Sequence, residues 1–202
     1  VSVVKSWKDG AKDVYTAYEV HQPAFFTPNL LSFATEGQDF RYAGVRTPLD
    51  HWQRWGSSDV SATIEGWARV VMSVAGLLAP DVVLNLIEHY AMYDQQSGDG
   101  TGRTNKLLPR YFQYESVEKI VTRATSEPRS RGLIYHTQGS GKTLTMSWVA
   151  TRLYFDPRMH NPTIVAVADR TQLVTQTFSQ FASAGVPEPV NAGSTSALQQ
   201  AL

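Results

Sequence analysis

A glycine-rich segment in the second half of the chain has the residue types and spacing of a phosphate-binding loop. Residues 136–143 run HTQGSGKT, with Gly141, Lys142 and Thr143 where this motif requires them and a second glycine, Gly139, inside the loop. Glycines allow the backbone to curl so that its amides point at phosphate oxygens. Lys142 supplies a charge for the β- and γ-phosphates, and Thr143 supplies a hydroxyl ligand for Mg²⁺. The segment therefore predicts a site for a nucleoside triphosphate.

The first position of this loop departs from the general pattern. It holds His136 where the pattern has glycine, which favours helicase-like variants over small GTPases. The alternative is a glycine turn with a chance lysine. That alternative is disfavoured because the matching residues stand between a predicted strand and a predicted helix, which is the setting that a phosphate loop needs.

The elements around the loop predict an α/β fold. Arg131–His136 and Thr163–Ala168 are short apolar runs typical of buried strands. Strand, helix, strand and helix with short links indicate a parallel sheet with right-handed crossovers. The helices are expected from apolar residues at helical spacing, namely Val117, Ile120, Val121 and Ala124; Met146, Val149, Ala150, Leu153 and Tyr154; and Val174, Phe178 and Phe181, with an end near Gly185.

The first half of the chain predicts a mixed α+β region. Leu30–Thr35 and Asp39–Val45 are β-prone runs joined by a turn at Glu36–Gln38. Trp52 and Trp55 either stack on nucleic-acid bases or anchor a linker, and the anchor is favoured because tryptophan is usually buried. Two helices are expected to bury Ile64, Trp67, Ala68, Val71, Ala75 and Leu78, and then Val82, Val83, Leu86, Ile87 and Tyr90.

Composition limits the class of protein. The chain has 202 residues, no cysteine and a formal net charge of zero, so disulfides and thiolate zinc sites are excluded. The sequence contains no run of about 18 apolar residues, which is the length that a membrane span requires. We therefore expect no membrane partner and a cytoplasmic location. Because the sequence starts at Val1 rather than Met and stops in a polar stretch at Leu202, we expect a piece of a longer protein.

Longer segments resemble one known family. Gly132–Met146 resembles the first helicase motif of the restriction (motor and endonuclease) subunits of type I restriction-modification enzymes, a superfamily 2 helicase-like family. Asp169–Leu173, with Gln176 and Phe181 beyond it, resembles the next motif of that family. Arg110–Gln113 resembles the element that reads adenine, with a phenylalanine where the family usually has histidine. Phe33–Trp55 is similar to the stretch that joins the nuclease domain of the family to its motor.

The resemblance implies a function for the whole protein. Such subunits bind ATP and Mg²⁺, translocate double-stranded DNA and cleave it, in a complex with methylation and specificity subunits. The sequence contains neither the Glu-x-Lys triplet of the nuclease nor the Asp-Glu box of the motor, so no catalytic residue is assigned within this chain. Two alternatives stay open: another superfamily 2 DNA helicase or translocase, and a catalytically inert nucleotide-binding fragment.

The resemblance also implies a division of the chain. Residues 1–56 would be the C-terminal part of a restriction-nuclease-like domain, and 57–108 a helical connector with a flexible loop at 97–105. Residues 109–202 would begin the first RecA-like P-loop domain, which contains the parallel sheet.

The predicted site residues fall into two sets. Gln113 is expected to read adenine, because its amide pairs with N6 and N7 of that base. Arg170 and Thr171, at a predicted helix start, are expected to contact a DNA phosphate; alternatively Asp169 caps that helix and Arg170 is solvated. The residues expected to bind nucleotide are Arg110, Gln113, Thr137, Gln138, Gly139, Ser140, Gly141, Lys142 and Thr143, with Thr143 also a ligand of Mg²⁺.

Overall fold

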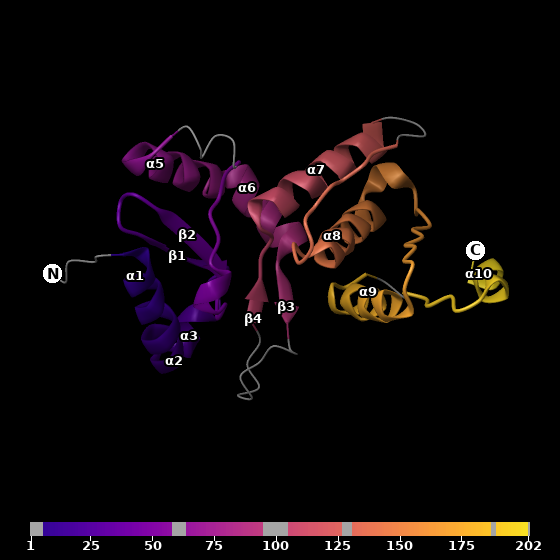
Figure 1. Ribbon diagram of the computed structural model, residues 1–202, viewed down its shortest axis with the longest axis horizontal. Coiled ribbons are helices and arrows are strands. Elements are labelled where there is room, and N and C mark those ends of the chain that lie inside the picture. The colour runs from indigo at the N-terminus through magenta and orange to yellow at the C-terminus, as the bar shows by residue number, and fades with distance from the viewer. Residues whose placement is uncertain (1–5, 58–63, 95–104, 127–130, 187–188, 202) are drawn as a thin grey trace. The chain divides into compact units, whose positions relative to one another are not determined.

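The computed structural model describes residues 6–57, 64–94, 105–126, 131–186 and 189–201 (Figure 1). The chain divides into two compact units, Val1–Phe112 and Gln113–Leu202. The predicted three-part division is a finer one and stays a prediction. Most of its flexible loop at 97–105 lies outside the described residues.

The described residues of the first unit form short helices and four short strands. Its α-helices are α1 (Trp7–Asp13), α2 (Glu19–His21), α3 (Pro23–Phe26), α5 (Gly66–Leu77) and α6 (Pro80–Asn85). Short π-helices, η1 (Val14–Tyr18) and η3 (Leu86–Tyr90), and a 3-10 helix, η2 (Leu49–His51), complete the set. Its strands are β1 (Leu31–Thr35), β2 (Phe40–Gly44), β3 (Met92–Asp94) and β4 (Asn105–Leu107).

The predicted hairpin is confirmed. β1 and β2 pair antiparallel, with Phe33 opposite Tyr42, and the turn between them contains Gly37 in the left-handed region at φ 93°. Thr35 fixes the turn, because its hydroxyl donates to the Asp39 carbonyl and accepts the amide of Gly37. Local hydrogen bonds of this kind allow the hairpin to form from neighbouring residues.

The hairpin packs on a small core that contains the tryptophans. Trp52 is buried with Ala11, Ala34 and Ala43, and the ring of Trp7 stacks on it at 6.4 Å. Trp55 is also buried, as the choice of an anchoring role over exposed base stacking expects, while the linker itself stays a prediction. The backbone of Gly44 passes so close to Lys106 that a Cβ atom there would collide with the Lys106 carbonyl. A side chain at position 44 is therefore incompatible with this packing.

The apolar face predicted for the helix near residue 70 is wrong. In α5 the buried residues are Val70, Ser73 and Leu77, whereas Trp67 is 67% exposed. Helical spacing predicts one apolar face, but apolar residues lie on nearly all sides of this helix. The tertiary contacts therefore select which face is buried. The next helical segment follows the prediction more closely, because Leu86 and Tyr90 are fully buried.

The second unit is built from helices. They are α7 (Tyr111–Ser126), which starts at the end of the first unit, α8 (Lys142–Phe155), the short η4 (Pro157–Met159), α9 (Thr171–Ser183) and α10 (Thr195–Ala201). Val117 and Val121 bury the predicted face of α7. Figure 1 shows the segment before α8 running back along α7. An ion pair joins the two helices, with Arg152 2.7 Å from Glu118.

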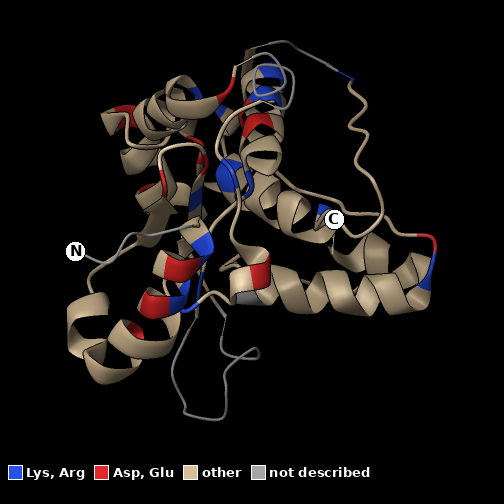
Figure 2. Ribbon diagram, turned by 60° about the vertical axis from the view of Figure 1, so that its left-hand side comes forward, with Lys and Arg blue, Asp and Glu red and all other residues tan. Residues whose placement is uncertain are grey.

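The predicted end of α9 is confirmed. Gly185 has φ 76°, and the amides of Gly185 and Val186 donate to the carbonyls of Ala182 and Phe181. These two bonds form the glycine-terminated helix end that the sequence suggested. Helix α9 contains no charged residue (Figure 2).

The expected buried parallel strands are not formed. Sheet pairing among the described residues is confined to the antiparallel pairs β1–β2 and β3–β4, and neither Arg131–His136 nor Thr163–Ala168 is a strand. Leu133 is 90% exposed and Val167 89%. A strand needs a neighbour for its backbone N–H and C=O groups, and within the described residues no such neighbour lies beside these segments. The structure is therefore a mixture of helices and small strands.

No described helix is by itself long and apolar enough to cross a membrane. Gly66–Leu77 and Pro80–Tyr90 reach that length and composition only as a pair, with a bend of 52° between them.

Candidate nucleotide-binding site

The backbone of the glycine-rich loop has the curled form that the sequence predicts. Gly139 and Gly141 both lie in the left-handed region, at φ 76° and 77°. Helix α8 begins directly afterwards, at Lys142. The first turn of a helix has amides without a partner inside the helix, and its dipole favours an anion. The loop and the start of α8 together therefore form a site suited to a phosphate group.

Gln113 of α7 contacts this loop, as its place in the predicted site requires. The side chain is buried, and its Nε2 donates to the carbonyls of Ser140 at 3.0 Å and of Gly141 at 3.3 Å. A Cβ atom on Gly141 would come within 2.6 Å of the same nitrogen. Gly141 is thus needed both for its positive φ and for the close approach of Gln113.

Lys142 is held by the carbonyls at the start of the loop. Its Nζ donates to the carbonyl of His136 at 2.9 Å and to that of Thr137 at 2.8 Å, and the side chain is exposed. These bonds keep the ammonium group beside the loop rather than extended into solvent. The charge is therefore close to where a bound phosphate would need it.

A contact that the sequence analysis missed joins the other end of the loop to α7. Ser116 Oγ lies 3.0 Å from His136 Nε2. Burial, and then the charge of Lys142, lower the pKa of His136, so the neutral imidazole is favoured. Ser116 follows Gln113 by three residues, a spacing that puts both on one face of a helix. That spacing puts Ser116 on the face of α7 that Gln113 turns toward the loop, but nothing local in the sequence indicates its contact with His136.

One buried group in the loop is suited to a ligand. Ser140 is 7% exposed, and its hydroxyl has no hydrogen-bond partner among the described residues. Burying a hydroxyl without a partner is unfavourable, and a polar ligand would remove that cost. Together with the curled loop, this hydroxyl shows that the residues present fit a nucleotide phosphate. A metal bound there would have Thr143, in the first turn of α8, as its protein ligand.

Clusters of three or more His, Asp or Glu side chains that could hold a metal ion are absent from the described residues.

Thr137, Gln138 and Gly139 are exposed around the loop, as ligand-facing residues would be.

Arg110 and Gln113, which the sequence treats as one element, fall in different units. Arg110 belongs to the first unit. There, burial raises the pKa of Tyr42, and the charge of Arg110 opposes this increase only in part. Gln113 belongs to the second unit and contacts the loop. The structure therefore supports a place at the loop for Gln113.

The predicted DNA-contacting residues stand at the start of α9. Arg170 is the N-cap residue and Thr171 the first helical residue, and both are exposed. Asp169 does not cap the helix, because the N-cap is Arg170 and has no side-chain hydrogen bond to the helix. Asp169 and Arg170 form a loose exposed ion pair at 3.9 Å.

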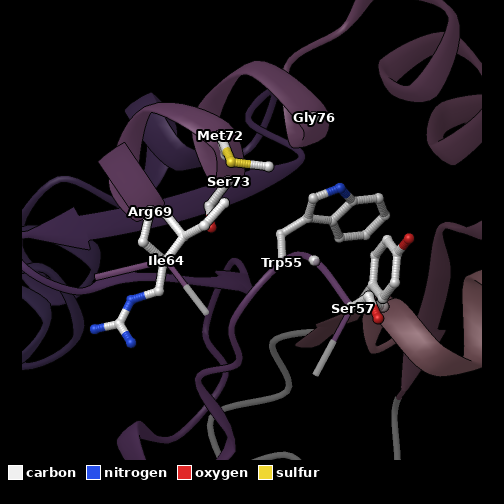
Figure 3. Close-up of a pocket in the computed structure, with 9 residues that line it drawn as sticks. Trp55, Ser57, Ile64, Arg69, Met72, Ser73 and Gly76 are labelled. Atoms are coloured by element: carbon white, nitrogen blue, oxygen red, sulfur yellow. The ribbon is translucent and has the colours of Figure 1, made fainter. Parts of the chain in front are cut away.

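A separate hollow lies within the first unit. It has a volume of about 210 Å³ and lies beside α5, between Trp55, Met72 and Gly76, and Tyr111 also lines it (Figure 3). The guanidinium group of Arg69 points away from Trp55 in this view. The ring of Tyr111 packs edge-on against Trp55 at 5.3 Å, within the first unit.

Comparison with known proteins agrees with the geometry of the loop. The family model of SWI2/SNF2 ATPases matches residues 112–202, which include Gln113 and the whole loop. The HindI type I restriction enzyme endonuclease subunit of Haemophilus influenzae is 39% identical over 113 residues, 54% of this chain and 10% of that protein. This chain is similar to endonuclease subunits of type I restriction enzymes, and its residues 112–202 are similar to the ATPase region that the family model describes.

Two further restriction-subunit relatives extend the comparison. Both are putative type I restriction enzyme endonuclease subunits of Methanocaldococcus jannaschii. MjaVIIIP is 35% identical over half of this chain, and MjaVIIP is 24% identical over 87% of it. The chain spans only about a tenth to a sixth of the length of these relatives, 10% and 16% respectively. No solved structure matches the chain.

Proposed function

We propose that this chain carries the ATP-binding part of the motor of a type I restriction subunit. The single observation that carries the proposal is the curled loop at the start of α8, with Gly139 and Gly141 at positive φ and Lys142 following them. A loop of this form binds phosphate through backbone amides and a lysine. The matches to SWI2/SNF2 ATPases and to restriction subunits support ATP as the nucleotide.

Each residue of the loop contributes one element of binding. Lys142 provides the positive charge for the terminal phosphates. The buried hydroxyl of Ser140 and the exposed backbone around Gly139 provide hydrogen-bonding groups at the phosphates. Mg²⁺, held at Thr143, would neutralise charge that develops on the phosphoryl oxygens. Thr137, Gln138 and Gly141 complete the enclosing backbone.

Recognition of adenine is assigned to Gln113. Its buried amide donates to the carbonyls of Ser140 and Gly141, so the residue is close enough to the proposed phosphate site to contact a bound nucleotide. Replacement by alanine separates the two roles. A lower ratio of ATP to GTP affinity would show base recognition, whereas an equal loss for both nucleotides would show support of the loop alone. A wild-type affinity for both nucleotides would remove Gln113 from the site.

In the whole protein the site would drive translocation of double-stranded DNA, and the restriction subunit would cleave that DNA together with methylation and specificity subunits. The fold proposed for residues 109–202 is the start of a RecA-like domain, preceded by the end of a nuclease-like domain. The apolar, exposed runs Arg131–His136 and Thr163–Ala168 support this, because such runs are suited to a fully covered parallel sheet. Further strands of a longer chain would cover them.

A DNA contact is assigned to Arg170 and Thr171. Both are exposed at the start of the 13-residue helix α9, where backbone amides and an arginine suit a phosphate of the DNA backbone. A contact of this kind carries no sequence information, so it fits a motor that moves along any DNA.

Replacing Lys142 by alanine in the intact protein tests the ATP site. Removing a charge that stabilises the transferred phosphoryl group reduces turnover by roughly 100-fold or more. DNA-stimulated ATP hydrolysis is the measurement, and Lys119→Ala is the control, because Lys119 is exposed and forms an ion pair with Glu115 four residues earlier on α7. Wild-type hydrolysis by Lys142→Ala would contradict the proposal.

The match to SWI2/SNF2 ATPases favours one other function, a DNA translocase that acts without restriction partners. Co-purification of the intact protein with methylation and specificity subunits distinguishes the two. A nucleotide-binding protein without ATPase activity is the remaining alternative, and the hydrolysis assay above separates it from a motor.

A further inference from the structure

We propose that Ser116 and His136 form a pair that positions the phosphate-binding loop. The inference rests on the proposed ATP site. It assigns a role to the histidine that stands where the general loop pattern has glycine, and to a serine that the loop motif does not include.

The loop is attached to one face of α7 at two points. Gln113 donates to the carbonyls of Ser140 and Gly141, next to the start of α8. Ser116, one turn later on the same face, lies 3.0 Å from the ring of His136 at the start of the loop. The curled residues between these attachments therefore span a fixed distance along α7.

His136 also reaches Lys142 through its backbone. Its ring bonds to Ser116, while its carbonyl accepts a hydrogen bond from Lys142 Nζ at 2.9 Å. A glycine at position 136 would keep the carbonyl but lose the ring that fixes it. The serine–histidine contact therefore determines where the lysine ammonium group is held before a nucleotide binds.

The ion pair between Glu118 and Arg152 supports this arrangement. It joins α7 to the last turn of α8, and the Arg152 side chain is 13% exposed. Helix α8 is thus fixed on α7 separately from the loop. Loss of the Ser116–His136 bond should consequently loosen the loop without detaching the helix that follows it.

The test uses Ser116→Ala, His136→Phe and the double variant in the intact protein. Phenylalanine keeps a ring but removes the nitrogen. A hydrogen bond contributes about 0.5–1.5 kcal/mol, which corresponds to a 2- to 12-fold loss of affinity for a fluorescent ATP analogue. We expect each single variant to show that loss, and the double variant to lose no more than the worse single one. Ser116→Thr, which keeps the hydroxyl, should retain wild-type affinity.

Thermal unfolding separates positioning from general stability. Without nucleotide, the melting temperature of Ser116→Ala should lie within about a degree of that of the wild type. The increase in melting temperature caused by ATP and Mg²⁺ should be smaller in the variant. Thr125→Ala is the matched control on α7, because that hydroxyl bonds to backbone carbonyls of its own helix. The control should match the wild type in both measurements.

The outcomes distinguish this inference from the ATP site itself. Unchanged affinity in both single variants, or strictly additive losses in the double variant, would overturn the pair. If Lys142→Ala abolishes hydrolysis while the pair has no effect, the ATP site stands and the positioning role fails. If Lys142→Ala has no effect, the proposed function itself fails.

Discussion

The two units contain similar β-prone, apolar segments, but these segments form paired strands only in the first unit. In the first unit, β1 and β2 are five residues each, pair with each other and pack on a core with Trp52. In the second unit, Arg131–His136 and Thr163–Ala168 form no strand, and most of their side chains are exposed. Yet the second unit contains the proposed phosphate-binding loop.

The difference follows from the type of sheet that each sequence encodes. An antiparallel pair closes through a short turn, so every hydrogen bond comes from residues nearby in the chain. A parallel sheet needs crossovers and covering on both faces, and its strands read as continuous apolar runs. The curl of the loop forms without the sheet because the glycine torsions are local and because the loop is attached to α7 instead, through Gln113 and Ser116.

The largest expected effect tests whether the exposed runs are covered in the longer protein. Val167→Asp in the intact protein should cost several kcal/mol of folding stability, because a covering sheet would bury the new charge. Circular dichroism melts and limited proteolysis measure the loss. The matched control is Phe25→Asp in the first unit, where the side chain is 69% exposed, and it should change stability by less than about 0.5 kcal/mol. Equal, small effects of the two would mean that Val167 stays exposed.

A smaller effect tests the closed packing of the first unit. Gly44→Ala places a methyl group against the Lys106 carbonyl, and overpacking of this kind costs about 1–3 kcal/mol. Urea unfolding of the intact protein, followed by tryptophan fluorescence, reports the change near Trp52. The comparison variant is Gly132→Ala, where an added Cβ meets nothing within 4 Å and φ is not positive. A silent Gly44→Ala would show that β2 and β4 do not pack as described.

The smallest effect is a pH dependence in the first unit. Burial raises the pKa of Glu19, although its carboxylate accepts hydrogen bonds from Ser32 and from the Arg46 amide. A raised pKa in the folded state means that ionisation opposes folding, so this contribution to stability is lost as pH rises through the folded-state pKa. Glu19→Gln should therefore be slightly more stable than the wild type at pH 7.

The gain from Glu19→Gln should vanish near pH 4, where the wild-type carboxyl is protonated as well. Melting temperatures measured between pH 4 and pH 8 report the difference. A variant that is less stable than the wild type at neutral pH would show that the two hydrogen bonds outweigh burial. Asp13→Asn, on an exposed carboxylate, serves as the control and should show no such trend.

The sequence by itself determined the features that depend on neighbouring residues. The phosphate loop is marked by Gly139, Gly141 and Lys142, whose torsional freedom and charge are properties of the residues themselves. The hairpin and the end of α9 at Gly185 follow from turn chemistry in the same way. Similarity to restriction subunits was likewise readable from contiguous motifs, and the comparisons confirm it.

Only the tertiary structure decided which faces are covered and which distant residues meet. The apolar residues of α5 form more than one possible stripe, and packing chose Val70 and Leu77 over Trp67. The bond between Ser116 and His136 joins residues 20 apart, on a helix and on a loop. No local propensity specifies such a pair, because it exists only once α7 lies beside the phosphate loop.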